Sequence, residues 1–282
     1  MNLLTTGTRR VASRVLRPLV RRAARAYVAG EHLSDAIGTL ERLKIRSLAA
    51  TLGFWDGPLD SPRSVADRYL QALSVLPNRG AYLSIKLPAL KFSAELASEV
   101  ARAAAAAGVR LHCDAHDIEL VDQTKWITEE MLRCGAAVSC TLPGRWQRSV
   151  DDAQWAIDHR LPVRVVKGQW TDPADPARDP KAGFLEVIDQ LAGRAASVAV
   201  ASHDIPLAVE AIRRLEAAGT PCTWELLFGL PMRAALRQAA ECNIPVRVYV
   251  PYGAAYMPYA VGKLRQNPRI AWWLLRDMLC RN

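Results

Sequence analysis

Several apolar, strand-like segments of this chain are followed by side chains that can do chemistry. The groups with acid–base or hydrogen-bonding capacity at these places are Lys86, Asp114, Arg164, Lys167, Ser202, His203, Asp204, Glu225 and Tyr249. In parallel α/β proteins the carboxyl ends of the strands meet on one side of the sheet, where active sites lie. We therefore expect these side chains to converge on one site.

The cations and the flat aromatic rings indicate what such a site could hold. Arg164 and Lys167 could face a phosphate or the electron-rich edge of a flavin, which becomes a stronger oxidant near positive charge. Tyr249 and Trp170 could wall a flat pocket. Lys86 and Asp114 could form an ion pair across neighbouring strands.

A metal site is the alternative for the same end of the barrel. His112, Asp114 and His116 share one face of a strand because side chains alternate along it, and His203 and Asp204 could join them. However, residues two apart on a strand are separated by roughly 7 Å, so their side chains would have to converge. We expect no metal.

The elements that must position these groups alternate between strand and helix. The predicted strands are Ile45–Gly53, Ala81–Leu87, Val109–Ala115, Ala136–Leu142, Val163–Gly168, Ser197–His203, Cys222–Phe228 and Val246–Val250. Helical patterns include Asp35–Leu43, Ser64–Leu76, Ser93–Ala107, Val121–Cys134, Val150–His159, Leu207–Ala218, Met232–Cys242 and Ile270–Leu279. Eight such units predict an α/β fold, a closed (β/α)8 TIM barrel with an N-terminal helical extension and a C-terminal helix. An open doubly wound sheet is disfavoured because the turn Gly53-Phe54-Trp55-Asp56-Gly57 is no dinucleotide-binding fingerprint.

Composition fits one barrel and excludes several other classes. The chain has 282 residues, 50% of them hydrophobic, and a formal net charge of +9. Seven arginines precede the first acidic residue, Glu31, so we expect residues 1–30 to form a basic helical segment ahead of a single barrel at 31–282. That segment suggests a transit peptide, a membrane-surface helix or a solvated helix. The other basic residues form no stripe, so we expect no nucleic acid partner. The six cysteines form no C-x-x-C pair.

The strand ends, taken in order, resemble the proline dehydrogenase family. The strongest match is Val246-Arg247-Val248-Tyr249-Val250-Pro251-Tyr252-Gly253 with Tyr256, Pro258 and Tyr259 after it. The run Val163–Gly168 is similar to the family's R-L-V-K-G flavin strand. Lys86, Asp114, Ser202-His203-Asp204 and Leu226-Leu227-Phe228-Gly229 follow the family's order, and the resemblance covers nearly the whole chain.

This resemblance implies bound FAD and oxidation of a carbon next to a secondary amine, proline to 1-pyrroline-5-carboxylate being the family's reaction. It further implies a quinone-type electron acceptor. The cofactor would be lined by Thr141, Arg164, Val166, Lys167, Gly168, Gln169, Thr171, Ser202, His203, Asp204 and Glu225. The substrate side would be formed by Lys86, Asp114, Trp170, Leu227, Tyr249, Tyr259 and Lys263.

The substrate side departs from the family pattern. Where the family carries Y-x-x-R-R-L-x-E, this chain reads Tyr259-Ala260-Val261-Gly262-Lys263-Leu264-Arg265-Gln266. The paired arginines that grip the substrate carboxylate are thus replaced by glycine and lysine, and a point charge does not substitute for a forked guanidinium. One lost charge-assisted contact weakens binding by roughly tenfold or more. The glutamate expected after the first strand is also absent at Phe54-Trp55-Asp56-Gly57.

Three hypotheses therefore stand beside one another. The chain is a proline dehydrogenase with Lys263 or Arg265 as the anchor, a flavin dehydrogenase for a proline derivative or carrier-bound prolyl group, or a barrel that binds FAD or a partner without catalysis. A metal-dependent hydrolase is the least favoured class. We expect a cytoplasmic protein, with possible peripheral contact to the inner membrane through the basic N-terminus, or a matrix protein in a eukaryote.

Overall fold

Eight strands pair in chain order and close into a parallel barrel. The computed structural model of the protein describes residues 29–253, and β8 returns to pair with β1. The strands are β1 (Ala49–Phe54), β2 (Ala81–Ile85), β3 (Leu111–Cys113), β4 (Val138–Pro143), β5 (Val163–Val166), β6 (Val198–Ala201), β7 (Cys222–Leu227) and β8 (Val246–Tyr252). The predicted barrel is confirmed. The N-terminal helical extension and the C-terminal helix that the sequence predicts lie outside the described residues.

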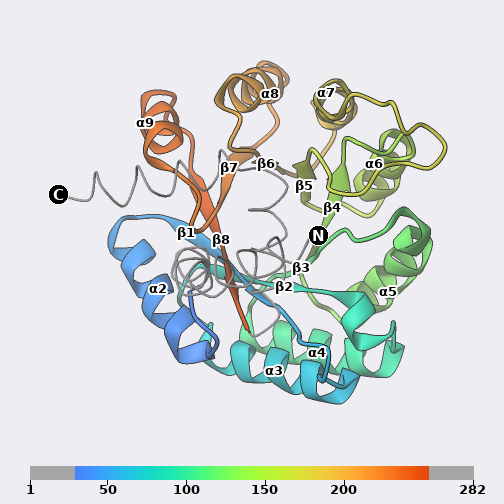
Figure 1. Ribbon diagram of the computed structural model, residues 1–282, viewed down its shortest axis with the longest axis vertical. Helices are drawn as coiled ribbons and strands as arrows, with labels where there is room; N and C mark the ends of the chain where they lie inside the picture. Colours follow the sequence, from blue (N-terminus) through green and yellow to red (C-terminus); the bar gives the residue numbers. More distant parts are fainter. Residues whose placement is uncertain (1–28, 254–282) are drawn as a thin grey trace, which may run out of the picture.

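The α-helices form a ring around the strands (Figure 1). They are α2 (Leu33–Ile45), α3 (Pro62–Val75), α4 (Ala94–Ala107), α5 (Val121–Arg133), α6 (Ser149–Asp158), α7 (Pro180–Leu191), α8 (Ile205–Ala217) and α9 (Arg233–Glu241). Helices α3 to α9 each connect one strand to the next. Helix α2 precedes the barrel, lies between α9 and α3 in the ring, and packs on β1 and β8.

Polar residues ahead of several helices fix where these helices begin. Ser61 accepts a hydrogen bond from the backbone of Ser64 at the start of α3, and Asp179 accepts one from Lys181 at the start of α7. Proline follows each cap at a position where its missing N–H costs nothing. Asp204 caps α8 in the same way, with its carboxylate accepting from Leu207. This last cap places the residues before α8 at the carboxyl end of β6.

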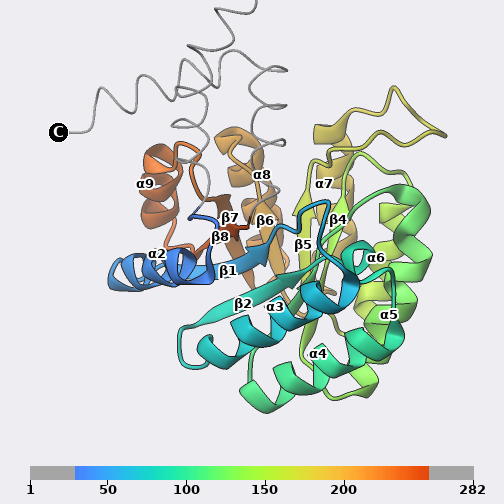
Figure 2. The same ribbon diagram turned by 60° about the horizontal axis from the view of Figure 1, so that its bottom comes forward.

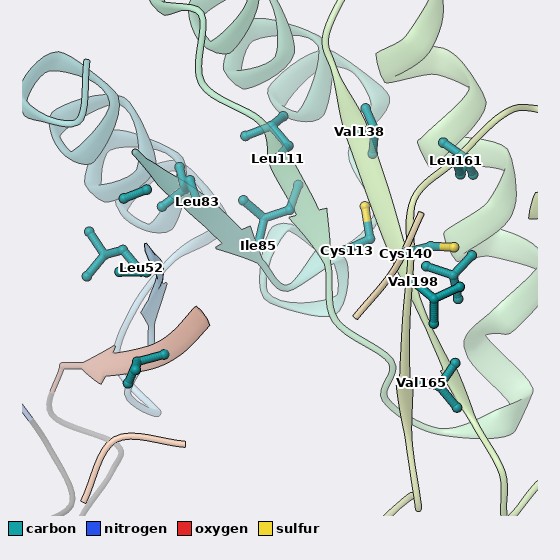
Figure 3. Packing of buried hydrophobic residues seen from close by; sticks show 14 of the residues in the cluster. Leu52, Leu83, Ile85, Leu111, Cys113, Val138, Cys140, Leu161, Val165 and Val198 are labelled. Carbon is teal, nitrogen blue, oxygen red and sulfur yellow. The ribbon is translucent and has the colours of Figure 1, made fainter. Parts of the chain in front are cut away.

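The strands have one apolar and one polar face. Outward residues such as Leu52, Leu83, Leu111, Val138 and Val165 are buried in the layer between the strands and the helices (Figure 3). The inward residues are largely polar, and they include Thr51, Ser84, His112, Ser139, Thr141, Arg164, Glu225 and Tyr249. Barrel interiors are usually filled by branched apolar side chains. Here the apolar core lies mainly outside the barrel wall, and its interior is a hydrogen-bonded network.

Three predicted boundaries or elements need correction. The first strand begins at Ala49 rather than Ile45, because Leu33–Ile45 forms the whole of α2. The third strand ends at Cys113, so Asp114 and His116 belong to the connection after it. No helix was predicted between the fifth and sixth strands, where α7 follows a long connection that stands out from the barrel (yellow in Figure 2). Within residues 29–253, no helix is long and apolar enough to cross a bilayer.

Candidate active site

A cavity of about 870 Å³ opens at the carboxyl ends of the strands. Its volume falls within the range of roughly 300–1,000 Å³ that is typical of ligand and cofactor sites. All eight strand ends contribute to its lining, which consists of Trp55, Asp56, Lys86, Pro88, Ala89, Asp114, Ala115, His116, Thr141, Pro143, Arg164, Val166, Lys167, Gly168, Gln169, Trp170, Ala201, Ser202, His203, Glu225, Leu226, Leu227, Leu230 and Tyr249. This is the end of a barrel where active sites are found.

Arg164 of β5 connects two carboxylates at the centre of this cavity. Its Nε and Nη2 donate to the two carboxylate oxygens of Glu225 at 2.9 and 2.6 Å, and its Nη1 donates to Asp114 Oδ1 at 2.9 Å. The guanidinium also lies 5.2 Å from the centre of the Tyr249 ring. Burial alone would lower the pKa of Arg164, but the charges of Glu225 and Asp114 outweigh burial and raise it. The cation is therefore permanent, and both carboxylates neutralise it.

Tyr249 of β8 connects this cluster to the first strand. Its hydroxyl donates to Asp114 Oδ2 at 3.0 Å and accepts from Trp55 Nε1 at 3.4 Å. Burial, together with the charge of Asp114, raises the pKa of Tyr249 well above its ordinary value, so the phenol stays protonated. Gly53 makes this placement possible, because a Cβ atom there would lie 2.2 Å from the Tyr249 hydroxyl.

Lys86 lies at the end of β2 with two partners from the turn after β1. Its Nζ is 3.6 Å from Asp56 Oδ1 and 4.8 Å from the centre of the Trp55 ring. Burial lowers the pKa of Lys86, while the charges of Asp114 and Asp56 act in the opposite direction. The predicted ion pair between Lys86 and Asp114 is wrong. Asp114 instead accepts a hydrogen bond from Arg164, which lies on β5 and crosses the barrel interior to the end of β3.

The rim beside β6 and α8 carries the predicted Ser202-His203-Asp204 turn. His203 Nε2 accepts from the backbone of Leu227 at 2.9 Å, so its Nδ1 carries the proton and faces the carbonyl of Pro231 at 3.3 Å. Burial lowers the pKa of His203. Asp204 caps α8 and pairs with Lys181 at 2.8 Å and Lys167 at 3.7 Å. Two cations thus lie next to the positive end of a helix dipole.

Most of the predicted site residues within residues 29–253 line this one cavity. They are Lys86, Asp114, Thr141, Arg164, Val166, Lys167, Gly168, Gln169, Trp170, Ser202, His203, Glu225, Leu227 and Tyr249. Asp204 lies behind this lining as the helix cap, and Thr171 lies exposed beyond Trp170. Tyr259 and Lys263 lie outside the described residues, as do Gly262 and Gln266.

Trp55 and Asp56 belong to the site although the sequence did not assign them to it. Both residues stood out only as a departure from the family pattern, yet they hold Lys86 in place. His116 was considered only as a metal ligand, and its ring lines the cavity with its centre 6.2 Å from that of Trp170. These residues could have been predicted from their positions shortly after β1 and β3, where active-site residues of a barrel lie.

His112 is engaged in a way that does not suit a metal site. Its Nδ1 is 2.8 Å from Ser139 Oγ and its Nε2 is 2.7 Å from Thr141 Oγ1, so both ring nitrogens already have hydroxyl partners. Among residues 29–253, no three His, Cys, Asp or Glu side chains come together as a metal site would require. The hydroxyls of β4 therefore occupy the nitrogens that the metal interpretation needs.

Fold and site together define a (β/α)8 barrel with a charged, aromatic-walled cavity large enough for a cofactor. No family model matches the chain. Two curated relatives are proline dehydrogenase 1 of Bacillus subtilis (strain 168), 26% identical over 278 residues, and proline dehydrogenase of Deinococcus radiodurans, 26% identical over 305 residues. These matches cover 92% and 98% of this chain, and 91% and 96% of the relatives.

Solved structures show the same fold. Proline utilization A from Bdellovibrio bacteriovorus superimposes with a TM-score of 0.77 at 16% identity, over 89% of this chain. Proline utilization A from Corynebacterium freiburgense gives a TM-score of 0.70 at 17% identity, over 98% of this chain. This chain spans 33% and 35% of those longer proteins. The resemblance inferred from the sequence is confirmed, since the chain is similar to the proline dehydrogenases over nearly its whole length.

Proposed function

We propose that this protein is an FAD-dependent dehydrogenase that oxidises proline or a related secondary amine to the imine. One observation carries the proposal. Fourteen of the eighteen residues that the family resemblance assigns to substrate and cofactor, scattered over seven strand ends, line a single cavity of about 870 Å³. The two curated relatives of nearly equal length, both named proline dehydrogenase, support the same activity.

The cavity wall fits a flavin. At Gly168 the backbone has a φ of +93°, and a Cβ atom there would lie 2.9 Å from the Pro143 Cβ and 3.0 Å from the Arg145 Cβ. The glycine therefore lets the chain pass tightly against Pro143 and Arg145 beside Val166 in the cavity wall. Lys167 and Lys181 supply positive charge near the start of α8, which suits a pyrophosphate. The cofactor would be held by the eleven predicted residues from Thr141 to Glu225 named above.

Several substrate-side residues have a definable task. The flavin, when bound, takes up the hydride equivalent from the carbon next to the amine. Asp114 and Tyr249 present a carboxylate and a protonated phenol that can orient a substrate nitrogen. Leu227 adds an apolar wall that excludes water, and Trp170, whose side chain is 39% exposed, lies at the rim. Tyr259 and Lys263 remain proposed contacts outside the described residues.

A substrate with a masked carboxylate is the second candidate, and the ion pairs in the cavity favour it. Among the described residues, the two cations deep in the cavity already have partners: Arg164 has Glu225 and Asp114, and Lys86 has Asp56. A free carboxylate would have to compete with these partners. With Gly262 and Lys263 in place of an arginine pair, a proline amide, ester or carrier-bound prolyl group fits such a site.

The electron acceptor and the cellular setting belong to the same proposal. A quinone-type acceptor follows from the family resemblance, and the Arg-rich residues 1–30 would bring the barrel at 31–282 to the surface of the inner membrane that holds it. The protein would otherwise reside in the cytoplasm, or in the matrix of a eukaryote.

The test is the absorption spectrum of the purified protein and its bleaching under anaerobic conditions. We expect a yellow protein whose flavin is reduced by proline, by proline amide, or by both. Bleaching by low concentrations of proline alone would contradict the masked-carboxylate candidate. A yellow protein that no secondary amine bleaches would favour a non-catalytic barrel, and a colourless protein would refute the proposal.

A further inference from the structure

A second, much smaller chamber lies behind the wall of the candidate active site. It has a volume of about 30 Å³ and is lined by residues from the ends of β3 and β4 and from the helices α5 and α6. The residues it shares with the main cavity are Asp114, Ala115, His116, Thr141 and Pro143. A chamber needs roughly 10–15 Å³ to hold a water molecule, so one or two waters fit here.

Two buried polar atoms in the lining residues of this chamber require a hydrogen-bond partner. His116 Nε2 and Ser149 Oγ are both buried, and neither has a partner among residues 29–253. Buried polar groups in native proteins are almost always hydrogen-bonded, to protein or to ordered water. A polar chamber of this size with two such atoms therefore matches a site for bound water.

Ion pairs lead from this chamber to the surface. Asp152 in its lining pairs with Lys125 Nζ at 2.9 Å and with Arg148 Nε at 2.9 Å. Arg148 in turn pairs with Asp122, whose side chain is 81% exposed. The chamber therefore lies between His116, which also lines the main cavity, and a set of ion pairs that reaches the exposed Asp122.

The proposed reaction needs such a route. A secondary amine is protonated at neutral pH, so its nitrogen carries two hydrogens and a positive charge, and its lone pair must be freed before hydride can leave the neighbouring carbon. The ammonium first gives one proton to a base. The neutral amine then loses a hydride, one proton with two electrons, from that carbon to the flavin. The carbon and nitrogen become doubly bonded, and the product is an iminium cation whose nitrogen keeps its one hydrogen. One proton per turnover must therefore leave the cavity.

We propose that His116 and the chamber behind it form the proton exit of the active site, a proposal that rests on the proposed function. His116 takes up the ammonium proton on the cavity side. Water bound between His116 and Ser149 then passes it toward Asp152 and the surface. Asp114 and Glu225 suit this task less because both are already paired with Arg164.

The surroundings of His116 are compatible with this role. Burial lowers the pKa of His116, and the charge of Lys86 adds to that effect, while Asp114 and Asp56 raise it. Asp117, Lys125 and Asp152 are the other charged groups that line the chamber with it. A neutral imidazole with an unpaired ring nitrogen can accept a proton and release it quickly.

The test replaces the proton acceptor and leaves the shape. In the full-length, FAD-loaded His116→Gln variant, proton release is followed with a pH indicator in weak buffer while an amine that bleaches the wild-type flavin is added anaerobically. We expect proton release and bleaching to slow by about 10²-fold, since a positioned base typically contributes at least that much. Added imidazole should restore the rate of bleaching in proportion to its concentration, which a merely structural defect would not allow.

His159→Gln is the matched control, because His159 lies exposed at the end of α6, outside the lining of both cavities. It should release protons at the wild-type rate. Normal rates in His116→Gln, or slow rates that imidazole does not restore, would overturn the proton exit while leaving the proposed function intact. A wild-type protein that no amine bleaches would instead refute the proposed function, and the exit with it.

A measurement that needs no turnover completes the test. A high-resolution crystal structure should show ordered water within hydrogen-bonding distance of His116 Nε2 and Ser149 Oγ, and Ser149→Val should exclude it and slow proton release. A dry chamber in the wild-type protein would overturn the proposal.

Discussion

The buried pair between Arg164 and Glu225 offers the sharpest test of how this barrel is held together. Glu225→Gln keeps the size of the side chain but removes its charge and one of its two acceptor oxygens. The wild-type pair is bidentate, at 2.9 and 2.6 Å, and the two side chains are only 7% and 4% exposed. Arg164 would keep Asp114 as its single charged partner.

The expected loss follows from these contacts. Breaking a buried ion pair from one side costs about 3–5 kcal/mol, and a single hydrogen bond to a charged group contributes about 1.5–3 kcal/mol. Because Asp114 and the amide oxygen still serve Arg164, we expect the lower end, about 3 kcal/mol. That is a large fraction of the roughly 5–15 kcal/mol by which folded proteins are stable.

Urea unfolding followed by circular dichroism measures this loss as a lower midpoint at an unchanged slope. Glu210→Gln on α8 is the matched control, because Glu210 pairs with Arg213 and Arg214 at the surface of the protein. It should leave the midpoint nearly unchanged, since surface ion pairs contribute little. Equal midpoints for the two variants would refute the idea that the interior pair stabilises the barrel.

Two further predictions concern the histidines and a glycine. Burial lowers the pKa of His112, His116 and His203 below the ordinary 6.5. Below pH 6.5 the unfolded chain therefore binds protons that the folded chain does not. The free energy of unfolding should fall as the pH drops, by up to about 1.4 kcal/mol per pH unit for each group; urea midpoints that stay level between about pH 7.5 and 5.5 would contradict this. Gly168→Ala should destabilise the protein and weaken FAD binding more than Gly219→Ala, because both have positive φ but only Gly168 is crowded by Pro143 and Arg145. Calorimetry and flavin titration compare them, and equal effects would argue against crowding.

The barrel could be predicted because each strand is a short apolar run. Val163–Val166 of β5 and Val246–Tyr252 of β8 are examples in which β-branched residues mark the strand. The boundary at Ile45 was missed because only two polar residues, Arg46 and Ser47, separate this apolar end of the helix from the apolar run that begins at Leu48. The α7 helix was not predicted because the Asp- and Pro-rich connection before Pro180 hides its start.

The pairing of charged side chains inside the barrel could not be predicted from the sequence in the same way. Lys86 and Asp114 follow neighbouring strands, so sequence favours pairing them. Closing the barrel brings Arg164 of β5 opposite Asp114, and a forked guanidinium with a second acceptor at Glu225 competes better than a lysine. The placement of Lys86 against Asp56 and Trp55 follows from the direct pairing of β1 with β2, which brings the ends of these two strands side by side.

The two faces of the strands have a consequence for how this protein tolerates change. Outward residues such as Leu83 and Leu111 pack against the helices, whereas inward residues such as Ser84 and His112 belong to the hydrogen-bonded network of the interior. Neighbouring positions along one strand therefore have different roles. A substitution scan along β2 to β5 should alternate with a period of two between loss of folding and loss of chemistry. Apart from the Arg164–Glu225 pair, which also stabilises the barrel, the lining of the cavity can then be redesigned for other ligands without rebuilding the surrounding helices.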